Sequence, residues 1–177
     1  MSTHDSVVVL SRALDQVSEI LAGIHEDQLD HPTPCGEWDV ARLVAHVVAT
    51  PANFIAMSKG EQPDWSAEPA PVRSGWTAAF RSGADDLIHI WHRAGADADP
   101  NQVAWQTAEF AIHAWDLARA TGQPTDLDPE VAAQGLGFMS RSLTSENRGP
   151  AFAAEVEVSE DASTYERLVA FAGRDPR

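Results

Sequence analysis

The sequence predicts an all-α fold, a bundle of four main helices with additional helical segments at its C-terminal end. Two observations lead to this prediction. Apolar residues recur every three or four positions in several separate stretches, which is the spacing of one helix face. Between these stretches stand clusters of proline and glycine, which end helices. At 177 residues the chain is predicted to form one domain, 1–177, with a well-buried core.

The first two helices are predicted over residues 5–25 and from Asp39 to about residue 60. The apolar face of the first consists of Val7, Leu10, Leu14, Val17, Leu21 and Ile24. Two prolines and a glycine within residues 31–36 exclude a helix there. Asp39 is suited to cap the second helix, and Pro51 is expected to kink it. The apolar stripe of this helix is Val40, Leu43, Val44, Val47 and Val48.

The remaining helices follow a proline-containing surface segment at residues 60–73. A third helix is predicted over about residues 74–93, with Trp76, Phe80, Leu87 and Trp91 on one face. The fourth covers residues 103–121, and Gly122 is suited to end it. Asp128 and Pro129 predict the start of a fifth helix. A final helical segment is expected over residues 163–172.

The composition excludes several classes of partner. A net charge of −15 argues against nucleic acid and anionic membrane surfaces, which select basic patches. We find no run of about twenty apolar residues that would span a bilayer. The first residues lack the positive region of a signal peptide, and the single cysteine cannot form an internal disulfide. We therefore expect a cytoplasmic protein.

The fourth predicted helix carries an unusual polar stripe. Most of its circumference is apolar, which is typical of a buried helix. At about 100° per residue, its polar positions fall within about 80° of one another: Gln106, Glu109, His113 and Asp116. Glu109 and His113 lie one helical turn apart. Because a buried carboxylate and imidazole are costly unless paired or bound to a metal, the stripe is expected to face a polar partner.

His46 is a candidate for that partner. It lies among aliphatic residues at the edge of the stripe on the second helix. An edge position of one helix can face the interior of a bundle, so His46, Glu109 and His113 would supply two nitrogens and one oxygen. Three protein ligands with an open position are the pattern of a catalytic zinc site, and bundles commonly build metal sites between facing helices.

Simpler interpretations compete with a metal site. A single histidine at the edge of a stripe is commonly a satisfied core residue, and a Glu–His pair four apart is commonly a surface pair. His89 and His92 have ligand-like spacing but are expected to face solvent. Cys35 is interpreted as a packed loop thiol rather than a nucleophile. Asp116 is expected either to orient His113 or to cap a neighbouring chain end.

Three segments resemble a known family. They are Thr33–Val40 (TPCGEWDV), Leu43–Val48 (LVAHVV) and His113–Gly122 (HAWDLARATG). They are similar to the mycothiol-dependent maleylpyruvate isomerase N-terminal-domain family, which belongs to the wider DinB/YfiT-like metal-binding bundles. The ending Arg167–Pro176 is similar to a subgroup of short actinobacterial members.

The resemblance implies a four-helix bundle that binds a divalent metal ion, usually zinc, with family ligands at His46, Glu109 and His113. In the wider superfamily the open metal position is thought to receive a small thiol such as mycothiol. The isomerase has a second, C-terminal domain, which a chain of 177 residues is not expected to contain. Maleylpyruvate isomerisation itself is therefore not expected.

Three functions remain open at this point. The first is a zinc- and thiol-dependent S-transferase or isomerase that acts on a small electrophile. The second is a metal or small-molecule binding protein without turnover. The third is a zinc hydrolase that activates water. The expected partners are a small thiol and an electrophilic substrate, and a homodimer is left open.

Overall fold

The computed structural model describes residues 2–148 and 152–177. Over this part of the chain the regular structure is helical, which confirms the all-α prediction. Two short 3₁₀ turns, Glu26–Gln28 and Gly95–Asp97, lie between longer helices. The α-helices are α1 (Thr3–Ala22), α2 (Val40–Ser58), α3 (Trp76–Ala94), α4 (Pro100–Ala120), α5 (Pro129–Ser142) and α6 (Thr164–Phe171).

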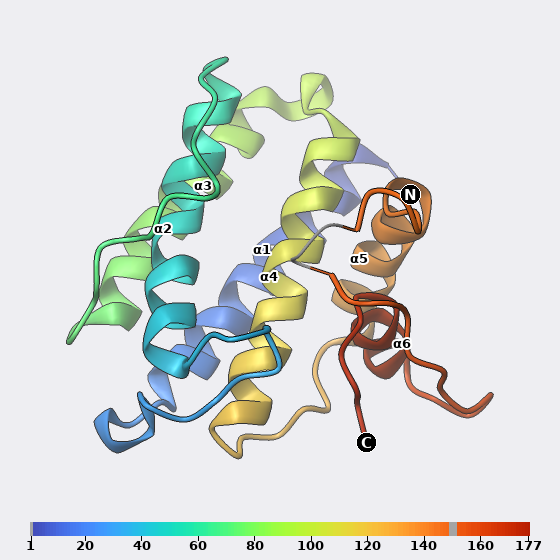
Figure 1. Ribbon diagram of the computed structural model, residues 1–177. Helices are drawn as coiled ribbons and strands as arrows, with labels where there is room; N and C mark the ends of the chain where they lie inside the picture. Colours follow the sequence, from blue (N-terminus) through green and yellow to red (C-terminus); the bar gives the residue numbers. More distant parts are fainter. Residues whose placement is uncertain (1, 149–151) are drawn as a thin grey trace.

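Helices α1 to α4 form the bundle, and α5 and α6 extend it on one side (Figure 1). α4 packs against α1, α2 and α5, while α3 closes the other side of the bundle against α1 and α2. α6 packs mainly on α5. The additional C-terminal helices therefore cover α4 from the side opposite α2 (Figure 1).

This central position explains why α4 is apolar nearly all round. Its side chains meet neighbours on several sides, so few positions reach water. Asp99 caps its start by accepting from the Asn101 amide, and Pro100 occupies the first turn. Its end has the predicted glycine: Gly122 has φ 69°, and the Gln123 amide donates to the Ala118 carbonyl at 2.9 Å.

α2 begins and ends close to the predicted positions. The Asp39 carboxylate accepts from the Arg42 amide, as expected of a cap, and the helix continues through Pro51. Within the described residues, α2 is the one helix that is long and apolar enough to cross a membrane by length and composition alone. This is weak evidence for a span, because core helices of soluble proteins have the same length and composition.

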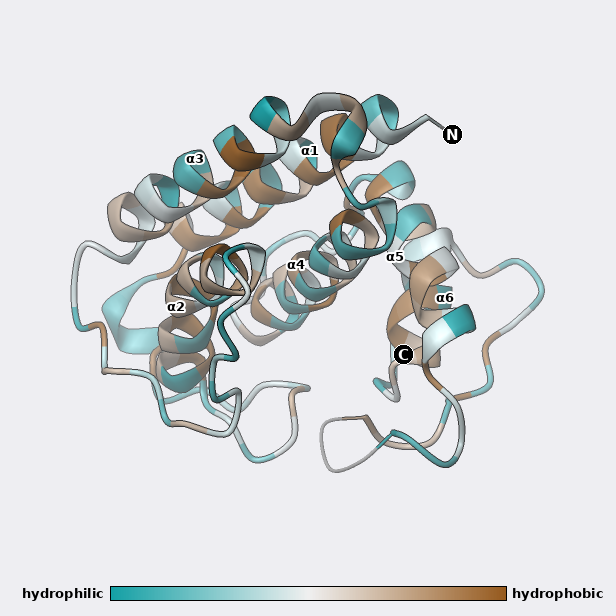
Figure 2. Cartoon of the chain, turned by 90° about the horizontal axis from the view of Figure 1, so that it is seen from above, coloured by the Kyte–Doolittle hydropathy of each residue, from teal (hydrophilic) through white to brown (hydrophobic). Residues whose placement is uncertain are grey.

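The buried apolar side chains form one connected core. Figure 2 shows the hydrophobic faces of the helices turned toward one another and the hydrophilic faces turned outward. α5 approaches α4 closely at Gly135, where an added Cβ would lie 3.1 Å from Cα of Ala108. The close contact between these helices therefore depends on the absence of a side chain there.

A capped helix and a tight turn build the C-terminal end. Ser163 and Glu166 form a reciprocal capping box at the start of α6. After α6, Gly173 turns the chain with φ 86°, and an added Cβ would lie 2.6 Å from the Ala153 carbonyl oxygen. Only glycine fits this turn, which brings Arg174 back into the interior.

Candidate metal centre

The structure brings His46, Glu109 and His113 together between α2 and α4. Oε1 of Glu109 lies 2.8 Å from Nε2 of His46 and 3.2 Å from Nε2 of His113. The two imidazole rings meet edge to face, with centroids 5.0 Å apart. The Glu109 side chain is 18% exposed and the His113 side chain is 10% exposed, so the cluster lies just below the surface.

The partners of the two ring nitrogens of His113 determine its protonation state. His113 Nε2 faces the Glu109 carboxylate, and Nδ1 lies 3.1 Å from Oδ2 of Asp116. An ionised carboxylate only accepts hydrogen bonds, so His113 donates from both nitrogens and carries a positive charge. Burial alone would lower the pKa of His113, but the Glu109 charge and the bond to Asp116 outweigh it and raise the pKa.

The same contacts lower the pKa of Glu109, whereas they raise that of His113. Burial favours the neutral acid, but the charge of His113 and hydrogen bonds from both imidazoles hold the pKa of Glu109 well below its usual range. The cluster is thus an ionised carboxylate between two imidazoles. This arrangement satisfies the polar stripe that the sequence places on an otherwise apolar helix.

The donor set has the chemistry and spacing of a divalent-metal site. One ligand atom from each of the three residues lies within 4.8 Å of the other two. Ligands about 2.0–2.1 Å from a tetrahedral zinc ion lie about 3.3 Å from one another, so small side-chain movements would bring these atoms into range. Two imidazole nitrogens and one carboxylate oxygen are also a common ligand set for catalytic zinc.

The loop before α2 forms one wall of the cluster. The Thr33 amide and hydroxyl both donate to the Trp38 carbonyl, at 3.0 and 2.8 Å, and the Val40 amide donates to the His31 carbonyl. These bonds close the loop and place the centroid of the Trp38 ring 5.1 Å from the centroid of the His46 ring. The guanidinium of Arg42 covers Trp38, 4.9 Å from its centroid.

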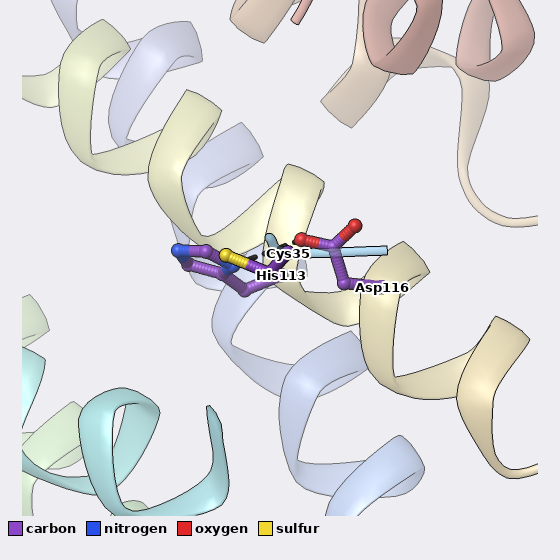
Figure 3. A group of neighbouring side chains, drawn as sticks. All are labelled: Cys35, His113 and Asp116. Atoms are coloured by element: carbon purple, nitrogen blue, oxygen red, sulfur yellow. Dashed lines mark hydrogen bonds and ion pairs between the residues drawn. The ribbon is translucent and has the colours of Figure 1, made fainter. Parts of the chain in front are cut away.

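The same loop places Cys35 close to His113. Ligand atoms of Cys35, His113 and Asp116 also lie within 4.8 Å of one another, and Figure 3 shows the sulfur beside the imidazole ring. Burial raises the pKa of the Cys35 thiol. A protonated, half-buried thiol is a weak nucleophile, in agreement with the interpretation of Cys35 as a packed loop residue.

Asp116 orients His113, one of the two roles expected from the sequence. The structure adds Arg174, which sequence reasoning missed: its guanidinium contacts both carboxylate oxygens of Asp116, at 3.2 and 3.0 Å. A buried carboxylate calls for a counter-charge, but nothing in the sequence indicates which arginine supplies it. His89 and His92 are exposed on α3, as predicted.

Comparison with known proteins places the chain in a family. The model of the mycothiol maleylpyruvate isomerase N-terminal domain matches residues 10–118. The chain belongs to this family. It is also 34% identical to uncharacterised proteins from two strains of Mycobacterium tuberculosis, CDC 1551 / Oshkosh and ATCC 25618 / H37Rv, over 98% of this chain and 100% of each relative. No solved structure gives a significant match.

The region matched by the family model contains the three donor residues and Asp116 but not Arg174. His46, Glu109, His113 and Asp116 fall within residues 10–118, whereas Arg174 lies beyond them. The resemblance identified from sequence segments is thereby confirmed. The family supports a mycothiol-related, isomerase-like domain, and the geometry of the cluster provides the basis for a more specific proposal.

Proposed function

We propose that His46, Glu109 and His113 hold one divalent metal ion, zinc in the first instance, and that the protein uses it to activate a small thiol. The observation that carries the proposal is the convergence of these three donor groups at one point between α2 and α4. The family match adds a sugar thiol of the mycothiol type as the candidate co-substrate.

The bound ion would supply a positive charge that keeps a coordinated thiol deprotonated. Side chains of the protein orient the ligands and attract the cation. Asp116 holds His113 with Nε2 directed toward Glu109, and Glu109 contributes the negative charge that attracts a cation. The Trp38 ring contacts the His46 ring at a tilt, with an interplanar angle of 59°, and supports it from one side.

In the proposed reaction the thiol loses its proton to solvent, and its sulfur adds to one carbon of a carbon–carbon double bond conjugated to a carbonyl group. The π bond at that carbon breaks, its electron pair moves to the carbonyl oxygen, and the resulting enolate either takes a proton from solvent or expels the thiolate again. The product is either a thioether or, after the thiol leaves again, an isomer of the substrate. The acidic chain offers no attraction to an anionic thiol, so a neutral sugar thiol is the better candidate. A cytoplasmic location is part of the same proposal.

One observation favours a second candidate, a metal-binding protein without turnover. Among the described side chains that adjoin the three donors, Asp116 is engaged by His113 and Arg174, and the Cys35 thiol is protonated at neutral pH. Neither is free to act as a general base. A hydrolase that relies on a separate general base to deprotonate its water has the least support from this arrangement.

Cobalt substitution tests the thiol-activation proposal. Cobalt-loaded protein should show the d–d bands of a four-coordinate ion, and mycothiol at millimolar concentration should add a sulfur-to-cobalt charge-transfer band. The same titration with glutathione should give a weaker response. A spectrum indifferent to every thiol would reject thiol activation and favour the binding protein.

A further inference from the structure

A buried chain of charged side chains connects the C-terminal segment to the cluster. Asp116 is 0% exposed and Arg174 is 5% exposed. Nε and Nη2 of Arg174 donate to Oδ1 and Oδ2 of Asp116, and Oδ2 also lies 3.1 Å from Nδ1 of His113. The carboxylate that orients His113 is therefore itself held at both oxygens.

Arg174 is held in turn by the segment around it. Its Nη1 donates to the Ala172 carbonyl at 3.0 Å, and its amide donates to the Val169 carbonyl at 2.9 Å. The left-handed turn at Gly173 directs it inward. A two-point contact between a guanidinium and a carboxylate is geometrically specific, which a lysine could not reproduce.

The group formed by Cys35, His113 and Asp116 could instead be interpreted as a second metal site. Arg174 argues against this interpretation. Its positive charge already neutralises Asp116 and occupies one position on each carboxylate oxygen. A cation placed there would meet a guanidinium within a few ångströms in a buried setting, where like charges repel strongly. The group therefore positions His113.

We propose that Arg174 is a positioning residue of the metal centre, which acts through Asp116 to fix the orientation of His113. This inference rests on the proposed metal site. It extends that site beyond the region shared with the family, because Arg174 lies outside residues 10–118. Outer partners of metal-binding histidines commonly change metal affinity by about 10–100-fold.

The coupling must act in both directions. If docking of Arg174 strengthens metal binding, then metal binding strengthens docking of Arg174 by the same factor. The amides of α6 and of the turn after it should exchange with solvent more slowly in the metal-loaded protein. The metal would thus stabilise a segment that supplies no ligand.

The test compares zinc affinity and cobalt spectra of the full chain and its Arg174→Gln and Arg174→Lys variants. We expect Arg174→Gln to weaken zinc binding about tenfold and to shift the cobalt d–d bands. Arg174→Lys should restore part of the affinity, since it keeps the charge but loses the second hydrogen bond. In an Asp116→Asn background, Arg174→Gln should change affinity less than twofold, because the partner is already altered.

Arg148→Ala is the matched control. Arg148 also fastens the C-terminal segment, donating to the Phe171 and Ala153 carbonyls, but makes no contact with Asp116 among the described interactions. It should lower the melting temperature and leave the cobalt spectrum unchanged. Equal spectral changes in the Arg148 and Arg174 variants would overturn the proposal and indicate general loosening.

The outcomes separate this inference from the proposed function. Wild-type protein that binds no metal overturns both. Wild-type protein that binds zinc together with a folded Arg174→Gln variant of unchanged affinity overturns only the role of Arg174. If Arg174→Gln does not fold, Arg174→Lys and hydrogen exchange of the wild type decide, and equal exchange of residues 164–174 with and without zinc overturns the proposal.

Discussion

His46 and Glu109, 63 positions apart in the chain, meet across the bundle with Nε2 and Oε1 at 2.8 Å. This contact joins α2 to α4 through polar atoms in a region where both helices are otherwise apolar. A charged carboxylate in such a setting is stable only when it is paired and hydrogen-bonded. Both histidines contact the same oxygen, Oε1, and a metal ion would take over that contact when bound.

Metal uptake should release about one proton per ion. His113 donates from both nitrogens in the described arrangement, and a metal ion would replace the proton on Nε2. Calorimetric titration with zinc at pH 7.5, in two buffers of different ionisation enthalpy, measures the release. Identical apparent enthalpies in the two buffers would contradict the assigned protonation of His113.

The competition between a metal ion and the proton on Nε2 of His113 also sets the pH dependence of zinc affinity. Because the pKa of His113 in the metal-free protein is raised, the site still holds its proton above the ordinary histidine value of about 6.5. Zinc affinity should therefore keep rising as the pH increases from 6 to 8 and should fall on acidification. The ion pair between His113 and Glu109 in the metal-free protein has the opposite pH dependence. Its contribution to the free energy of unfolding is present below about pH 6.5 and is lost as the pH rises through the raised pKa of His113. A zinc affinity that is flat over this range would count against the site.

Removing the metal should lower stability without unfolding the protein. Zinc at 100 times its dissociation constant contributes about 2.7 kcal/mol, whereas the core consists of apolar side chains that need no ion. A chelator should thus lower the melting temperature and leave the helical circular-dichroism signal intact. Loss of that signal, or an unchanged melting temperature in protein shown to contain metal, would be inconsistent with this account.

Gly135 and Gly137 on α5 should respond in opposite directions to added side chains. Gly135→Leu should destabilise the fold by about 1–3 kcal/mol, because the side chain must push α5 away from Ala108. Gly137→Ala should stabilise it by about 0.5–1 kcal/mol, since its nearest neighbour is the flexible end of Arg141 at 3.6 Å. Chemical denaturation measures both. A neutral Gly135→Leu variant would show that α4 and α5 do not pack as closely as described.

Local sequence patterns predicted most of the fold because the helices carry strong signals of their own. Asp39, Asp128 and the Gly122 ending all act as the sequence indicates. The apolar spacing of α1 and α3 likewise matches their buried faces. These signals depend on neighbours within a few positions, so they can be recognised without knowledge of the tertiary structure.

The candidate site was predictable only in part. The i, i+4 spacing of Glu109 and His113 and the unusual stripe on α4 indicated a polar partner, and His46 was a candidate from its place on α2. Arg174 was not predictable, because its role depends on a turn at Gly173 that returns the chain to α4. The proximity of Cys35 to His113 depends in the same way on how the loop before α2 closes.

The metal content of purified protein tests the central claim most directly. After dialysis against metal-free buffer, elemental analysis of the wild type should give about one divalent ion per chain. His113→Ala should abolish binding, and His46→Ala and Glu109→Ala should weaken it by orders of magnitude. His89→Ala, which removes an exposed histidine from α3, should keep full stoichiometry. A folded His113→Ala variant that retains one ion per chain would contradict the assignment of His46, Glu109 and His113 as the metal ligands.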